Sequence, residues 1–146
     1  MSAAIEHPAS TLVEGRASGK LKVLGEPLSF WGGLDSSSGK IIDRWHPQFG
    51  ETISGHILLL PQGRGSSSGS SVLAEALRLG TGPAGIILMK CDPIIITGAA
   101  VATLLYALNC PVVHLASVLE PGPGDGDEVA IEARPEGALL KIIRRD

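Results

Sequence analysis

The clearest hydrophobic pattern of the chain lies between residues 56 and 80 and predicts a strand, a glycine-rich loop and a helix. Residues 57–60 are four consecutive aliphatic side chains, a run typical of a strand that is buried on both faces in the parallel part of a sheet. Pro61 follows this run, and because proline cannot donate to a ladder we expect the strand to end there.

The helix after the loop is predicted by the spacing of its apolar residues. Residues 72–79 place apolar side chains near helical spacing, with charged residues on the other side. Gly80 predicts the end of this helix. We expect its start between Ser68 and Ser70, where a serine hydroxyl can accept a hydrogen bond from an unpaired amide.

Two further apolar runs extend this unit into a β-α-β-α-β core. Residues 84–89 predict a second strand, which Asp92 and Pro93 are expected to break, and residues 111–116 predict a third. Residues 98–108 are apolar nearly all round and predict a buried helix that this chain or another must cover. The fold class predicted is therefore α/β, with right-handed crossovers between parallel strands.

The remaining segments predict additional β structure around this core. Residues 12–30 alternate apolar residues with glycines and suggest one or two β segments, and residues 40–43 suggest a short strand. Residues 129–133 and 138–143 read as a closing hairpin. Residues 1–10 are expected to be a flexible leader.

Composition narrows the class of protein. The 146 residues leave room for one domain, which we expect to cover residues 11–146 after the leader. The net charge is −3, the twelve Lys and Arg residues form no stripe, and only two Trp, two Phe and one Tyr are present, so we expect no nucleic-acid partner. With neither a signal peptide nor a run long enough to span a bilayer, we expect a cytoplasmic protein with no membrane partner.

Cysteine usage predicts no metal site in this chain. Cys91 and Cys110 are too few and too far apart for a zinc or iron–sulfur motif. We expect two reduced thiols, with Cys110 packed in the core.

The glycine-rich loop carries the candidate chemistry. Residues 63–70 read Gly-Arg-Gly-Ser-Ser-Ser-Gly-Ser, so backbone amides can approach a ligand closely just before a helix N-terminus. Arg64 adds a side chain that can hold a carboxylate or phosphate by two donors. The alternative is a flexible serine-glycine turn. A P-loop is excluded because no lysine lies between Lys40 and Lys90, and the glycine spacing is one residue too long for a dinucleotide motif.

Two other segments hold secondary candidates. Trp31 follows Phe30 and precedes Gly32 and Gly33, so this aromatic pair is either a core plug beside a tight turn or the lining of a pocket. His46 lies in a loop bounded by proline and glycine, where it either makes a structural hydrogen bond or moves protons.

Three segments in order and spacing resemble the small subunit of the aconitase X family. They are Pro-Leu-Ser-Phe-Trp-Gly-Gly-Leu-Asp at residues 27–35, Gly-Lys-Ile-Ile-Asp-Arg-Trp-His-Pro at residues 39–47, and the loop at residues 63–70. The resemblance covers about residues 12–143. It implies a swivelling β/β/α domain, like the mobile fourth domain of aconitase, that closes on a larger subunit.

The resemblance also implies an activity and a division of roles. Family members are hydro-lyases whose large subunit holds an iron or iron–sulfur centre, and iron is expected to take the leaving hydroxyl of a small carboxylate substrate. The family's catalytic base is the serine directly after Gly-[Arg/Lys]-Gly, which is Ser66 here. The residues expected to contact substrate are Arg64, Gly65, Ser67, Ser68, Trp31, Gly32, Gly33 and His46.

The substrate is left between two family members. These are cis-3-hydroxy-L-proline dehydratase, whose loop the triple serine favours, and phosphomevalonate dehydratase of the mevalonate route. A carboxylate needs only Arg64 and loop amides, whereas a phosphate needs further donors, for which Arg44 is the other basic residue in a family-like segment. An alternative of another class is a stand-alone anion-binding module with no catalytic role.

Overall fold

A computed structural model describes residues 4–61, 67–116 and 123–144 of the chain. Its strands and helices alternate as the hydrophobic pattern predicts, and β strands are added at both ends of the chain. The elements in chain order are β1 (Ala4–Val13), β2 (Gly15–Val23), α1 (Phe30–Gly33), β3 (Leu34–Asp35), β4 (Lys40–Ile41), β5 (Ile57–Leu60), α2 (Gly69–Leu79), β6 (Gly85–Leu88), α3 (Pro93–Tyr106), β7 (Val112–His114), β8 (Glu128–Arg134) and β9 (Gly137–Ile143).

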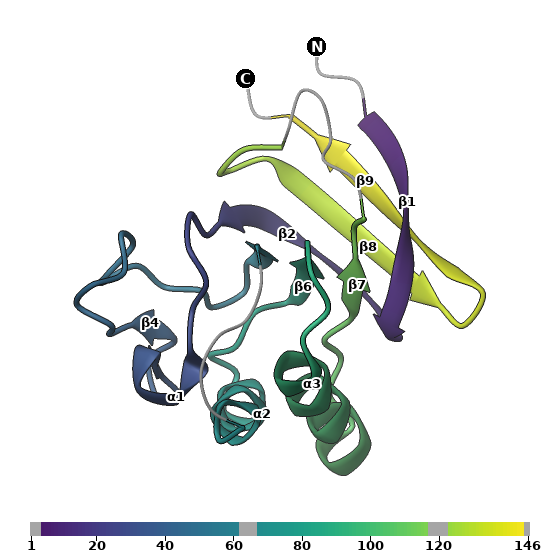
Figure 1. Cartoon of the computed structure of the whole chain (residues 1–146). Coiled ribbons are helices and arrows are strands. Elements are labelled where there is room, and N and C mark those ends of the chain that lie inside the picture. Colours follow the sequence, from purple (N-terminus) through teal and green to yellow (C-terminus); the bar gives the residue numbers. More distant parts are fainter. Residues whose placement is uncertain (1–3, 62–66, 117–122, 145–146) are drawn as a thin grey trace.

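Seven strands close into a barrel in the order β1-β7-β6-β5-β2-β8-β9 (Figure 1). Strands β2, β5, β6 and β7 are parallel, whereas β1, β8 and β9 pair antiparallel with their neighbours. The two long strands turn the corners of the barrel: residues 4–9 of β1 pair with β9 and its last residues pair with β7, while β2 passes from β8 to β5. Strands β3 and β4 form a separate small hairpin.

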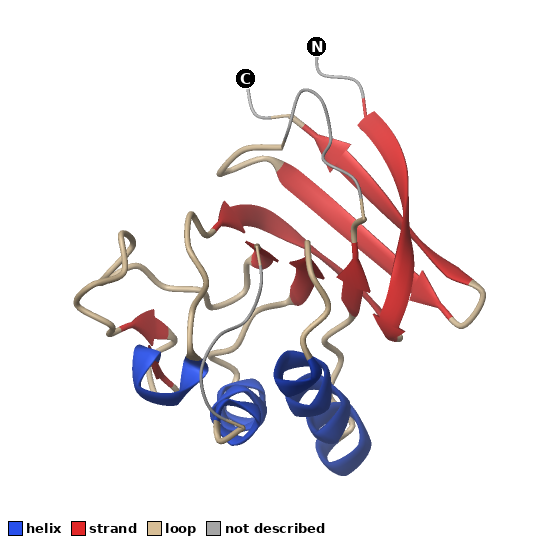
Figure 2. Ribbon diagram, in the orientation of Figure 1, coloured by secondary structure: helices blue, strands red, loops and turns tan. Residues whose placement is uncertain are grey.

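The molecule has three layers, with helices α2 and α3 covering one side of the parallel strands and the antiparallel strands covering the other (Figure 2). Strand β5 shows the arrangement: Leu58 and Leu60 pack toward the helices, and Ile57 packs between the two β layers. The predicted parallel β5-α2-β6-α3-β7 core and the closing β8–β9 hairpin are confirmed. So is the expected β/β/α class.

The expectation of a flexible leader is wrong for residues 4–10. These residues belong to β1, in which Ala4 pairs with Ile143 and Ala9 pairs with Ala138 of β9. The segment contributes few large apolar side chains to the core, so its hydrophobic pattern is weak. Its position is decided by backbone pairing with a strand from the far end of the chain.

The start of α3 also differs from the prediction. Asp92 and Pro93 begin a helix instead of merely breaking a strand: Asp92 is the N-cap, its carboxylate accepts a hydrogen bond from the amide of Ile94 at 2.8 Å, and proline occupies the first turn. The apolar helix is covered on its inner face only, and Leu104 and Leu105 remain 83% and 70% exposed. Among the described helices, none is long and apolar enough to cross a membrane.

Helices α2 and α3 approach each other at Gly98. A Cβ atom added there would lie 2.9 Å from the carbonyl oxygen of Ser70 and 3.1 Å from Cβ of Leu73, distances that require the helices to move apart. Glycine is therefore needed at this position for packing.

We predict that Gly98→Val lowers the free energy of unfolding by about 1–3 kcal/mol, the usual cost of forcing methyl groups into a packed core. Chemical denaturation followed by circular dichroism measures it. The matched control is Gly25→Ala, since a Cβ atom at Gly25 meets nothing within 4 Å. Equal stability of the two variants would show that α2 and α3 pack more loosely than described.

Candidate functional site

The carboxyl ends of the parallel strands form the edge at which the serine-rich loop is anchored. Leu60 of β5 lies in register with Leu88 of β6, and the amide of Met89 donates to the carbonyl of Leu60 at 3.0 Å. Each of these strands is followed by a helix that begins at the same edge. In α/β folds, ligands commonly bind at the carboxyl ends of the parallel strands.

The N-termini of α2 and α3 are joined directly. The hydroxyl of Ser70, in the first turn of α2, donates to the carbonyl of Ile94 in the first turn of α3 at 2.8 Å. Gly69 eases the approach of α2 to α3, because a Cβ atom there would lie 3.2 Å from Cγ2 of Ile94; its position 3.7 Å from the amide nitrogen of Trp31 shows that α1 also adjoins the start of α2. The start of α2 thus packs against both Trp31 of α1 and the first turn of α3.

The candidate residues Trp31, Gly32 and Gly33 differ in exposure. Phe30 is buried, whereas Trp31 is 60% exposed beside the start of α2. Phe30 therefore fills the core beside the turn, whereas Trp31 lies on the surface. Gly32 is exposed and has φ 79°, a left-handed conformation that favours glycine. Gly33 is buried, and a Cβ atom there would lie 3.1 Å from Leu28.

The structure describes only part of the serine-rich loop that is expected to hold the catalytic and substrate-binding residues. Arg64, Gly65 and Ser66 lie outside the described residues. Ser67 and Ser68 are exposed, and their carbonyl groups accept hydrogen bonds from the amides of the first turn of α2. The predicted hydroxyl cap is wrong for the N-cap Ser68, whose side chain makes no capping hydrogen bond.

The described charges at this edge favour an anion. Both helices begin at the edge, so the positive ends of their dipoles face it, and no acidic residue occupies the first turn of α2 or α3. The Asp92 carboxylate is used as the cap of α3. Lys90, in the loop that follows β6, is exposed. Sequence reasoning overlooked Lys90 because it is distant from residues 63–70 in the chain, whereas strand register brings the ends of β5 and β6 together.

His46 is buried, with hydrogen bonds at both ring nitrogens. Its Nε2 lies 3.1 Å from the carbonyl oxygen of Glu26, and its Nδ1 accepts from the amide of Gln48 at 3.1 Å. The side chain of Gln48 in turn accepts from Gly25 and donates to the carbonyl of Val23. The geometry therefore matches the structural alternative for His46: it ties the loop after β4 to the segment after β2.

The turn between β3 and β4 explains another part of the family-like segments. The carboxylate of Asp35 accepts from the hydroxyls of Ser38 and Ser37, at 2.7 and 2.8 Å, and these hydrogen bonds lower its pKa. Gly39 has φ 76°, and a Cβ atom there would lie 2.5 Å from the carbonyl oxygen of Thr81. These residues shape the turn and lie away from the anion edge.

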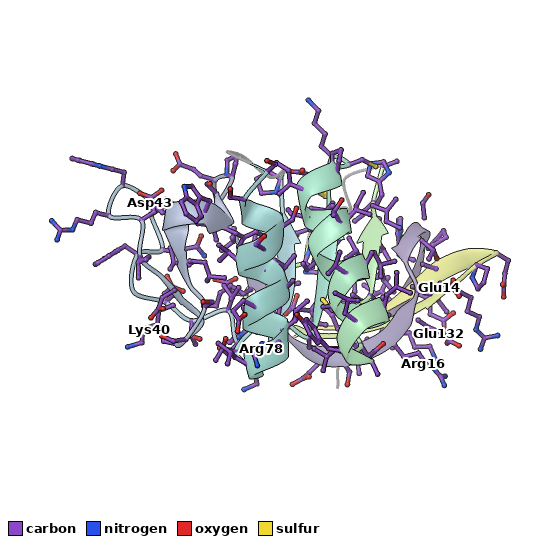
Figure 3. The ribbon with its side chains drawn as sticks, turned by 90° about the horizontal axis from the view of Figure 1, so that it is seen from below. Glu14, Arg16, Lys40, Asp43, Arg78 and Glu132 are labelled. Atoms are coloured by element: carbon purple, nitrogen blue, oxygen red, sulfur yellow. The ribbon has the colours of Figure 1, made fainter. Side chains whose placement is uncertain are left out.

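The antiparallel strands carry a cluster of charged side chains on their solvent-facing side. Arg16, Glu132 and Lys141 line a hollow of about 380 Å³ there, and Figure 3 shows Arg16 and Glu132 together on the side away from α1. The pKa of Glu132 is lowered chiefly by its hydrogen bond from Arg134, with smaller contributions from Arg16 and Lys141. Arg16 and Arg134 both donate to the Glu132 carboxylate, and Lys141 pairs with Glu6, so these charges are balanced by neighbours on the antiparallel strands.

The described residues offer no set of metal ligands. No group of three or more His, Cys, Asp or Glu side chains converges in this part of the chain. Cys91 is exposed in the loop after β6, and Cys110 is buried, as predicted. Burial raises the pKa of the Cys110 thiol to about 12.

Comparisons with known proteins agree with these features. Residues 6–139 match the family model of the aconitase X swivel domain. Over 105 residues, 72% of this chain, the sequence is 47% identical to a cis-3-hydroxy-L-proline dehydratase of Pseudomonas aeruginosa. Over 119 residues, 82% of the chain, it is 40% identical to the phosphomevalonate dehydratase small subunit of Methanothermobacter thermautotrophicus.

A comparison of three-dimensional structures also finds an aconitase X. The crystal structure of aconitase X from Thermococcus kodakaraensis superposes with a TM-score of 0.81 and 29% identity, covering 94% of this chain and 98% of that chain. The lengths of the curated relatives differ: the chain spans 18% of the Pseudomonas dehydratase and 87% of the Methanothermobacter small subunit.

We predict that a thiol reagent at about pH 8 modifies Cys91 and leaves Cys110 unreacted in the folded protein, because only a thiolate attacks and burial keeps Cys110 protonated. Colorimetric titration should count one reactive thiol in the native protein and two in guanidinium chloride. A Cys91→Ser control should show none until it unfolds. Rapid modification of two thiols in the native protein would contradict the packing around β7.

Proposed function

Because this chain belongs to the aconitase X swivel domain family, we propose that it is the small subunit of a cytoplasmic hydro-lyase that dehydrates a 3-hydroxy carboxylate. The observation that carries the proposal is the serine-rich loop between β5 and α2, at an edge where two helix N-termini and α1 meet. Its two free cysteines suit a reducing compartment. The rest of the catalytic machinery belongs to a large subunit.

Ser66 is the general base in this proposal. It removes the proton on the carbon next to the substrate carboxylate, and loss of the β-hydroxyl group then leaves a carbon–carbon double bond. A serine hydroxyl is a weak base, so its alkoxide needs stabilisation. Arg64, the loop amides and the N-terminus of α2 are the groups available for it.

The iron or iron–sulfur centre of the family is assigned to the large subunit. The described part of this chain lacks a converging set of His, Cys, Asp or Glu ligands, and its two cysteines lie one in a loop and one in the core. These residues do not fit an iron centre. The contribution of this chain is thus proton removal and binding of the substrate anion, through Arg64, Gly65, Ser67 and Ser68, with Trp31, Gly32 and Gly33 shaping the same edge.

The substrate we favour is cis-3-hydroxy-L-proline. Its single anion is a carboxylate, which Arg64 and loop amides suffice to hold. The 47% identity to a dehydratase of this compound supports the choice. The product is an enamine, which tautomerises to a Δ1-pyrroline carboxylate.

Phosphomevalonate is the second candidate. The chain covers 87% of a phosphomevalonate dehydratase small subunit, so the two are similar in extent. Lys90 also provides a second cation at the edge, which a phosphate would use more than a carboxylate. Arg44, the other basic residue in a family-like segment, is exposed on the loop after β4.

We predict that Ser66→Ala lowers turnover by about 10²–10⁴-fold, the effect of a lost acid–base group, without changing folding or subunit assembly. Steady-state kinetics of the assembled enzyme and its elution volume on gel filtration measure the two properties. Ser71→Ala, on the exposed side of α2, is the matched control and should stay near wild type. Activity near wild type in Ser66→Ala would remove Ser66 from this role and make Ser67 and Ser68 the next residues to test.

We also predict that the assembled, iron-loaded enzyme turns over cis-3-hydroxy-L-proline. Both substrates are offered in separate assays, with pyrroline formation or loss of phosphomevalonate as the readout. Turnover of phosphomevalonate alone would reverse the substrate choice and leave the role of Ser66 standing. If the chain instead stays monomeric, associates with no large subunit and binds a carboxylate or phosphate by itself, it is the anion-binding module.

A further inference from the structure

Aromatic side chains are rare in this chain, and most of those that are exposed gather in one region. Trp45 is 91% exposed, Trp31 60% and Phe49 54%, with Ile42 exposed beside them in the sequence. Large exposed aromatics in a chain that has only five are a signature of an interface, because Trp is enriched among the residues that dominate binding energy. We call Trp31, Ile42, Trp45 and Phe49 the aromatic surface.

This surface is continuous with the candidate site. The amide of Ile42 donates to the carbonyl of Gly33 in α1 at 2.8 Å, and the amide of Trp45 donates to the carboxylate of Asp43 at 3.0 Å. Figure 3 shows Asp43 beside α1 and Arg78 near the opposite end of α2. Since α1 contacts the start of α2 at Gly69, the aromatic surface adjoins the anchor of the serine-rich loop.

The backbone that presents these aromatics is held firmly. Ile41 and Ile53, on either side of the loop, are fully buried. His46 and Gln48 cross-link its centre to the segment after β2, and the amide of Phe49 donates to the carbonyl of His46 at 3.1 Å. A side chain exposed on such a fixed loop loses little backbone entropy when it binds a partner.

The exposed leucines of α3, Leu104 and Leu105, form a second apolar surface, but their position argues against contact with a partner that completes the active site. Leu104 is about ten residues beyond Ile94, or about 15 Å further along the helix axis from the edge where α3 begins. A partner that completes the active site must reach the opposite end of the helix. The aromatic surface is adjacent to that end, and Leu104 is not.

We propose that the aromatic surface is the docking site for the large subunit, with Trp45 inserted into an apolar pocket of that subunit. This inference rests on the proposed function. The chain spans only 18% of the length of the Pseudomonas dehydratase. Most of that enzyme therefore lies outside the part that matches this chain, and we expect this domain to contact it. The exposed Arg44 beside Trp45 suits an acidic residue at the rim of the pocket.

The test measures assembly of Trp45→Ala with the large subunit, identified by mass spectrometry in the complex of the wild-type chain. We expect Kd to rise about 30-fold or more, the size of an interface hot spot. The kcat at saturating large subunit should stay near wild type, because Trp45 is outside the site. Leu104→Ala is the matched control, an exposed apolar residue on another face, and should change Kd by less than about 3-fold.

The outcomes separate the two proposals. A wild-type complex that turns over substrate while Trp45→Ala assembles with unchanged Kd would overturn the docking site and leave the enzyme function intact. A larger effect of Leu104→Ala than of Trp45→Ala would do the same and move the interface to α3. If the wild-type chain assembles with no large subunit, the proposed function fails. If Trp45→Ala instead dissociates a homodimer, the occupant is a second copy and the docking proposal is wrong.

Discussion

Burial of strands β5 and β6 on both faces is the constraint on which the rest of the structure depends. Leu58, Leu60, Ile86 and Leu88 face the helices, whereas Ile57 and Ile87 face the antiparallel strands. Each such side chain contributes about 1.5–3 kcal/mol only when it leaves water completely, so neither face can be left open. The helices must cover one face, and the strands from the two ends of the chain must cover the other.

This layering places the candidate site. Parallel strands with helical crossovers end at one edge, and the helices begin there, so the end of β5 lies beside the end of β6 and the N-termini of α2 and α3 are joined there. Small residues allow the close approach of α2 and α3: Gly69 leaves room for Ile94, and the Ser70 hydroxyl donates to the Ile94 carbonyl. Neighbouring α1 and the loop after β4 extend this edge into an exposed aromatic surface. The proposed chemistry and the proposed docking site therefore share one side of the domain.

Local pattern was sufficient for much of the fold. The runs around Leu58, Ile86 and Val112 predicted the parallel core because short apolar runs bounded by turn residues are typical of strands buried on both faces. The closing hairpin around Glu136 followed from its turn residues in the same way. The family-like segments directed attention to Trp31 and Ser67, which the structure places at the edge or exposed next to it. The part of the site at residues 64–66 remains predicted from the sequence and the family.

By itself, the sequence determined the parallel strands of the core, the helices between them and the closing hairpin, that the central strands are buried, and that a glycine- and serine-rich loop precedes α2. The tertiary structure decided what those segments pair with. Only long-range backbone pairing made β1 a strand, and only packing separated Phe30 from Trp31 and buried His46 with both ring nitrogens bonded. The physical reason is that side-chain periodicity reports the local backbone and its buried face. Exposure and hydrogen-bond partners depend on residues far away in the chain.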